Sequence, residues 1–143
     1  MSSATNYTES AILNSVFGKT SDFGALASAP TLYVGLSTSD PGEAGSLTGE
    51  PTIGSAGYAR KATSASDWTA SSGGSAIENA GTLAFPESSG AWAAGASLTH
   101  FFLADAASAG NVLFKASLTT ARTVSATGVT LSFAAGALTC AAD

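Results

Sequence analysis

Charged side chains are scarce in this sequence of 143 residues. Only 10% of the residues are Asp, Glu, Lys or Arg, well under the roughly 25% of a typical soluble domain. Alanine, serine, threonine and glycine take the positions that charge normally occupies. A neutral surface of small side chains suits packing against other proteins, so we expect a chain that assembles.

Basic residues are the scarcest of the charged groups. The chain has five Lys and Arg against ten Asp and Glu, and its formal net charge is −5. Arg60 and Lys61 are the only adjacent basic pair. Because no basic cluster could displace counterions from phosphate, the sequence predicts no nucleic-acid partner.

Cysteine and long apolar runs are also lacking. Cys140 is the single cysteine, which excludes an internal disulfide and a cysteine metal cluster, and we expect it to be buried. No stretch approaches the roughly 20 apolar residues of a membrane span, so no membrane association is expected. The first residues lack the basic region and the apolar run of a signal peptide, which predicts synthesis in the cytoplasm.

Residues suited to catalysis are few. His100 is the only histidine and lies inside a predicted strand, where a hydrogen bond to backbone or a hydroxyl is expected. Neither a Gly-x-Ser-x-Gly elbow nor a phosphate-binding glycine motif occurs. Four carboxylates lack the spacing of a Ca²⁺ loop and are expected to form turns or face solvent: Asp40, Glu43, Glu50 and Asp105. We therefore expect no enzyme, no cofactor and no metal site.

The clearest positive signal is a two-residue alternation. Leu32, Val34 and Leu36 share one face of the stretch 31–37, and Ser39-Asp40-Pro41-Gly42 ends it as a turn. Similar short units follow along the chain. We predict strands at 31–37, 58–64, 77–85, 97–105, 111–118, 122–126, 129–133 and 138–140, with 97–105 and 111–118 forming an antiparallel hairpin.

This pattern predicts an all-β fold, an antiparallel β-sandwich or jelly-roll-like barrel of about eight strands with one short N-terminal helix. We divide the chain into an N-terminal arm and helix at 1–24 and a single β-sandwich domain at 25–143. The expected core consists of aliphatic and aromatic residues of the strands: Leu32, Val34, Leu36, Phe101, Leu103, Phe114, Leu131, Phe133 and Leu138.

The one convincing helix spans 8–18, with Thr8 or Asn6 as its cap and Gly18 as its stop. Its apolar stripe consists of Ile12, Leu13, Val16 and Phe17. A helix of this length does not persist alone, so the stripe must dock on another surface. That surface is either the chain's own sheet or a neighbouring subunit.

The order of the motifs resembles a family of small tailed-bacteriophage virion proteins, often labelled tail-fibre-like, some of which are similar to capsid decoration (cement) proteins. The resemblance extends from about Glu9 to Asp143. It follows the N-terminal helix and these segments: Ala29 to Gly42, Gly57 to Arg60, Phe85-Pro86 with Trp92, Leu98 to Phe101 with Asp105-Ala106, Gly110 to Phe114, Leu118 to Thr120 and Phe133 to Thr139.

The resemblance implies a cement protein that binds the outer surface of the phage head and clamps capsomers. It further implies the major capsid protein as partner, a homotrimer, and a place on the capsid surface of a virion assembled in the host cytoplasm. We expect the contacts to come from the helix and the loop 40–54: Tyr7, Ile12, Leu13, Val16, Phe17, Asp40, Glu43 and Glu50.

Two other functions remain open. A tail fibre or baseplate component that touches the host receptor would display clustered aromatics for sugar stacking, and Tyr58, Trp68 and Trp92 are the candidates if folding gathers them. A small-molecule-binding β-barrel would need an apolar cavity, which composition does not reveal.

Overall fold

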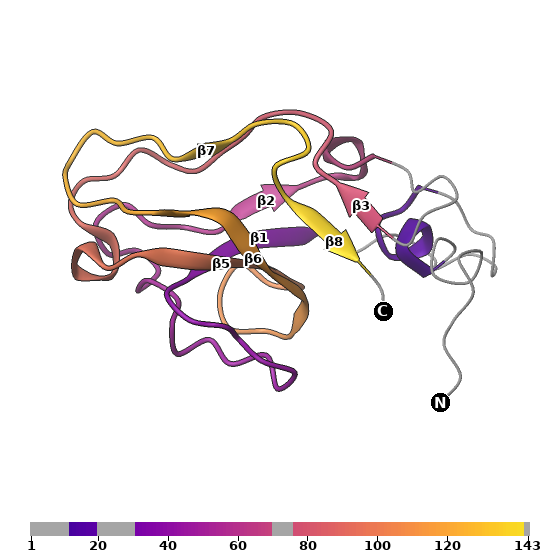
Figure 1. The fold of residues 1–143 in the computed structure, drawn as a ribbon, viewed down its shortest axis with the longest axis horizontal. Coiled ribbons are helices and arrows are strands. Elements are labelled where there is room, and N and C mark those ends of the chain that lie inside the picture. The colour runs from indigo at the N-terminus through magenta and orange to yellow at the C-terminus, as the bar shows by residue number, and fades with distance from the viewer. Residues whose placement is uncertain (1–11, 20–30, 70–75, 142–143) are drawn as a thin grey trace.

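Two β-layers enclose one hydrophobic core (Figure 1). The computed structural model describes residues 12–19, 31–69 and 76–141. The lower layer in Figure 1 is a four-stranded antiparallel sheet in the order β2-β1-β5-β6. Its strands are β1 (Leu32–Ser37), β2 (Lys61–Thr63), β5 (Leu98–Ala104) and β6 (Val112–Arg122).

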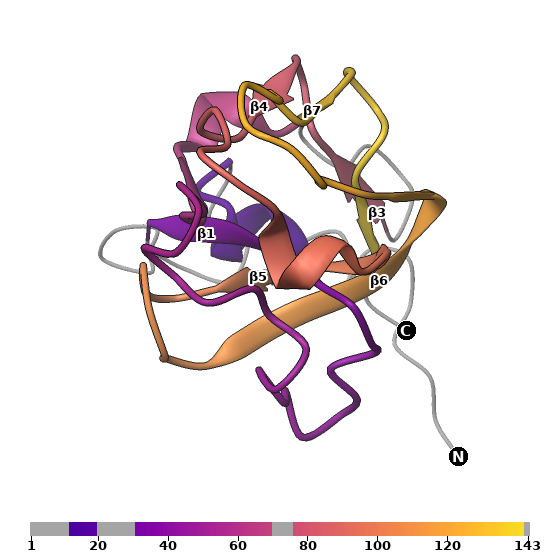
Figure 2. The same ribbon diagram turned by 90° about the vertical axis from the view of Figure 1, so that its left-hand side faces the viewer.

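The other four strands form two small antiparallel ladders. They pair β3 (Ala76–Glu78) with β8 (Thr139–Ala141), and β4 (Leu83–Ala84) with β7 (Ser132–Phe133). Figure 2, the view turned by 90°, shows β4 and β7 on the opposite side of the core from β1, β5 and β6. Two 3-10 turns, η1 (Ala65–Asp67) and η2 (Trp92–Gly95), follow β2 and β4 in the sequence. The all-β prediction with about eight strands is therefore confirmed.

The core follows the predicted alternation. Leu32, Val34 and Leu36 of β1 are at most 2% exposed, as the two-residue period requires. All nine predicted core residues belong to the core cluster or, in the case of Phe114, pack against it half-buried. Cys140 is also buried, as predicted, and burial raises the pKa of its thiol to about 12.

The opposite face of the four-stranded sheet is also covered. Phe102 lies on this outer face and is fully buried. Figure 1 shows the loop after β1 and the β5–β6 connection below the sheet, on the side away from β7. The predicted hairpin of β5 and β6 is confirmed, with Phe102 opposite Lys115 and His100 opposite Ser117.

Four predicted strands are divided, missing or shortened, and one of them, 129–133, is a strand only at Ser132–Phe133. The stretch 77–85 is divided into β3 and β4, because the buried Asn79 turns the chain. The side-chain Nδ2 of Asn79 donates to the carbonyls of Gly81 and Ala134, and its side-chain Oδ1 accepts the Leu138 N–H. No separate strand forms at 122–126: β6 continues to Arg122, and residues 123–126 are not in a strand. The stretch 58–64 is a strand only at Lys61–Thr63.

The N-terminal helix is confirmed over its described part. Residues 12–16 are helical, and Gly18 adopts a φ of 66° at the end, where a glycine is favoured. Tyr7 and the proposed caps Thr8 and Asn6 lie outside the described residues. The boundary drawn at residue 24 also lies outside them, so the division into an arm and a domain stays a prediction.

Candidate protein interface

The helix packs on its own chain. Leu13 and Phe17 are 0% and 1% exposed and belong to the core. The Phe17 ring lies 4.9 Å from that of Trp68 and 5.8 Å from that of Phe114. Leu13 and Phe17 are therefore not available to a partner, and the expectation that they form contacts was wrong, because burying an amphipathic stripe within the chain already satisfies it. Val16 is half-buried, and Ile12 is 43% exposed.

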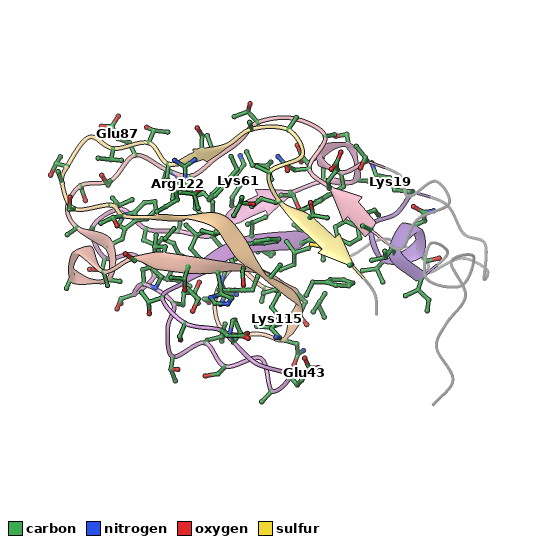
Figure 3. The ribbon with its side chains drawn as sticks, in the orientation of Figure 1. Lys19, Glu43, Lys61, Glu87, Lys115 and Arg122 are labelled. Carbon is green, nitrogen blue, oxygen red and sulfur yellow. The ribbon has the colours of Figure 1, made fainter. Side chains whose placement is uncertain are left out.

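Asp40 and Glu43 lie beside β6. The Asp40 carboxylate accepts the Gly42 N–H at 2.9 Å, as the predicted turn requires. Lys115 of β6 places its Nζ 3.1 Å from Asp40 and 3.8 Å from Glu43, and Figure 3 shows Lys115 and Glu43 close together below the sheet. The Glu43 side chain is fully exposed. These residues stay candidates for contact with a partner.

The Gly42 N–H, and after it Lys115, hold the pKa of Asp40 below its usual 3.8. Stabilisation by Asp40 is thus present above pH 3.8 and is lost as the pH falls through the lower folded-state value. Because the backbone contact is the larger cause, we expect Lys115→Met to raise the pKa of Asp40 only part of the way. A carboxyl-carbon NMR titration measures this, and a full return to the usual value would contradict the account.

Glu50 is turned inward. Its carboxylate accepts two hydrogen bonds from Arg60, from Nε and Nη2, at 2.7 Å each, and a third from the Tyr58 hydroxyl at 3.1 Å. The side chains of Arg60 and Glu50 are 0% and 7% exposed. The expectation that Glu50 contacts a partner was wrong, because in a chain with few charges a buried guanidinium needs this carboxylate.

Arg60 joins the two loops below the sheet. Its Nη1 donates to the carbonyls of Ala106 and Ala109, in the β5–β6 connection, at 2.6 and 2.9 Å. Its guanidinium carbon lies 5.1 Å from the centre of the Phe102 ring, within cation–π range. Tyr58 in turn accepts the Leu36 N–H at 3.0 Å. This network of Arg60, Glu50 and Tyr58 holds the outer loops on the sheet.

Tyr58, Trp68 and Trp92 do not form an exposed aromatic surface. Each is at most 2% exposed. The fold does bring Tyr58 and Trp92 together, with ring centres 5.1 Å apart, but inside the core. Sugar stacking on these three rings, which the receptor-binding alternative required, is therefore contradicted by their burial.

His100 is half-buried on the outer face of β5. Its Nδ1 lies 2.9 Å from the Thr99 hydroxyl and its Nε2 lies 3.2 Å from the Ser117 hydroxyl, in agreement with the predicted hydroxyl partner. Asp105 accepts the Asn111 N–H at 2.7 Å and so closes a turn, as predicted. Within the described residues, His, Cys, Asp and Glu form no group of three that could hold a metal ion.

Strand β6 provides the most accessible surface of the four-stranded sheet. It is the last strand of the sheet, and from Thr119 to Arg122 every residue is exposed. Leu113 is 40% exposed. Two hollows border the strand: one of about 450 Å³ between its first residues, the turn at Gly42 and Ala141, and one of about 160 Å³ between Leu118 and Ala137. The geometry therefore points to β6 as the candidate interface.

The family model described as "Gp80: Podophage GP4 fiber I protein gp80" matches residues 3–141. The chain belongs to this family. It is accordingly a bacteriophage structural protein and a component of the virion, as the sequence resemblance predicted. No curated protein matches the sequence. No helix within the described ranges is long and apolar enough to cross a bilayer.

The family membership leaves the position of the chain within the virion open. Sequence reasoning missed Arg60 as a structural residue and β6 as the accessible edge. A signal for Arg60 was present: Tyr58 and Arg60 are two residues apart in an extended stretch, which places both on one face. The length of β6 had no such signal, because its second half, from Thr119, lacks apolar alternation.

Proposed function

We propose that the chain is a structural subunit of a virion fibre and acts through protein–protein contacts without catalysis. The family match, which carries the word fiber in its description and extends over residues 3–141, is the observation that carries the proposal. The burial of Tyr58, Trp68 and Trp92 favours the body of a fibre over a receptor-binding tip. Scarce charge and a long accessible strand suit repeated contacts.

Capsid decoration is the second candidate. A cement trimer bound to the major capsid protein would use the same kind of neutral surface, and Ile12 with the turn at Asp40 and Glu43 stays accessible for such contacts. Many copies that bind only the assembled shell would stabilise it by mass action. The turn at Asp40 and Glu43 would then face the head.

Immunogold labelling of purified particles tests the proposal. Antibodies raised against the purified chain should label the fibres, and prior absorption of the antibody with the chain should remove the label. Label spread over the head would replace the fibre function with capsid decoration. If mass spectrometry does not detect the chain in purified particles, both the fibre function and capsid decoration are overturned.

A further inference from the structure

The two edges of the four-stranded sheet differ. At one edge, β2 has three residues and runs directly into η1. At the other edge, β6 has eleven residues and pairs with β5 alone. Apart from the pairing with β5, no backbone hydrogen bond joins residues 112–122 to any other described residue. Within residues 12–19, 31–69 and 76–141, the edge of β6 away from β5, called its free edge below, therefore presents a row of N–H and C=O groups without a backbone partner.

This edge has only some of the features that normally prevent pairing with another strand: β6 is irregular opposite β5 between Ser117 and Arg122 and near Val112, and it carries Lys115. Residues 112–122 contain neither Pro nor Gly, and its two charges are held by the chain itself. Lys115 contacts Asp40 and Glu43. The Arg122 guanidinium lies 5.6 Å from the centre of the Phe133 ring and donates to the Ser132 carbonyl at 3.3 Å. Between them the edge offers mainly hydroxyl and methyl groups.

We propose that β6 is a self-complementary edge that pairs antiparallel with β6 of a second copy of this chain, so that two sheets join into one of eight strands. A twofold axis through Ser117, the midpoint of Val112–Arg122, gives full overlap of the two strands. Main-chain hydrogen bonds supply the affinity, as in other cases where a strand is added to a sheet edge.

The register with full overlap suits the side chains. Lys115 lies opposite Thr119 of the second copy, so like charges do not meet across the axis. The exposed Leu113 lies opposite Ala121, and Ala116 lies opposite Leu118, which places apolar groups together on each face. A register centred on Lys115 would instead set two ammonium groups against each other and is disfavoured.

The length of the edge is sufficient for an interface. Eleven residues at ~3.4 Å each extend for about 37 Å, which is long for an edge strand. The exposed second half of β6 and the two hollows beside it leave room for a second strand.

Cross-linking of the purified full chain tests this register. Because two Ser117 side chains meet at the axis, the Ser117→Cys variant should give a covalent dimer on oxidation or with a short bis-maleimide. Cys140 is buried and should not react. The matched control is Glu87→Cys, which is exposed and follows β4 in the sequence, outside β6, and we expect its yield of dimer to be at least about tenfold lower.

Charge substitution supplies a second readout. Ser117→Lys and Ser117→Glu each set like charges at the axis and should weaken self-association at least about tenfold, whereas a mixture of the two should restore it. Sedimentation measures the association, and circular dichroism confirms that both variants fold. A wild-type monomer at roughly 100 µM, a dimer insensitive to both charges, or a trimer without the Ser117→Cys cross-link would overturn the proposal.

The inference rests on the proposed function only in requiring many copies of the chain in one assembly. A negative result in the immunogold labelling and a negative result in the cross-linking can be told apart. The immunogold labelling locates the chain on the particle, whereas the cross-linking examines one edge of the purified protein. If the label lies on the head and the purified chain still forms a dimer linked through position 117, the fibre function is overturned but the pairing of the β6 edges is supported.

Discussion

Glu50→Ala is expected to destabilise the protein by about 3–5 kcal/mol, because it leaves the buried guanidinium of Arg60 without its carboxylate. Three hydrogen bonds to Glu50 are lost together, two from Arg60 and one from Tyr58. The Arg60 side chain is 0% exposed, so water cannot take the place of the carboxylate without movement of the loops. Denaturant unfolding of the two proteins measures the difference in free energy.

Two controls separate this explanation from a general effect of losing a carboxylate. Glu87→Ala removes an exposed carboxylate and should change the free energy of unfolding by at most about 0.5 kcal/mol. Replacing both partners, as in Glu50→Ala with Arg60→Met, should recover part of the loss, because no uncompensated charge then stays buried. A cost below about 1 kcal/mol for Glu50→Ala alone would show that the pair is solvated.

Gly35→Ala should cost about 3 kcal/mol, at the upper end of the range for overpacking. A Cβ at Gly35 would overlap three carbons of the Phe102 ring, with 2.8 Å to Cε1, the most distant of them. The ring is fully buried and has the Arg60 guanidinium 5.1 Å from its centre, so it cannot easily move away. Thermal or denaturant unfolding measures the loss.

The sign of this effect should reverse when the ring is removed. In a Phe102→Ala background, Gly35→Ala should stabilise the protein by up to about 0.5 kcal/mol, because alanine loses less backbone entropy than glycine on folding. If Phe102→Ala does not fold, Phe102→Leu serves as the milder background and should reduce the cost of Gly35→Ala. Equal costs of Gly35→Ala with and without the ring would refute the packing explanation.

The sequence predicted the strands that are buried on at least one face, and it failed where side-chain hydrogen bonds direct the chain. Strand β1 follows from its two-residue alternation, and β5 follows from an apolar run on both faces, as expected for a central strand. The break between β3 and β4 depends on Asn79, whose side-chain amide donates a hydrogen bond to the carbonyl of Ala134. Contacts across 55 residues leave no local pattern.

The candidate interface was predicted only in part. The turn at Asp40 followed from its Asp-Pro-Gly sequence. The inward orientation of Glu50 did not, because it depends on where the fold places the Arg60 guanidinium, which the carbonyls of Ala106 and Ala109 also hold. The burial of Leu13 and Phe17 was one of two alternatives left open by the amphipathic stripe, and the contact with Trp68 decided between them.

The most direct test of the central claim, that the chain is a passive building block joined to other chains in the virion, is a reconstruction of the intact particle at a resolution that traces β6. The account predicts this chain in a fibre, in several copies, with the free edge of β6 paired with a strand of another copy. A chain placed in the particle with the β6 edge facing solvent in every copy would contradict the account.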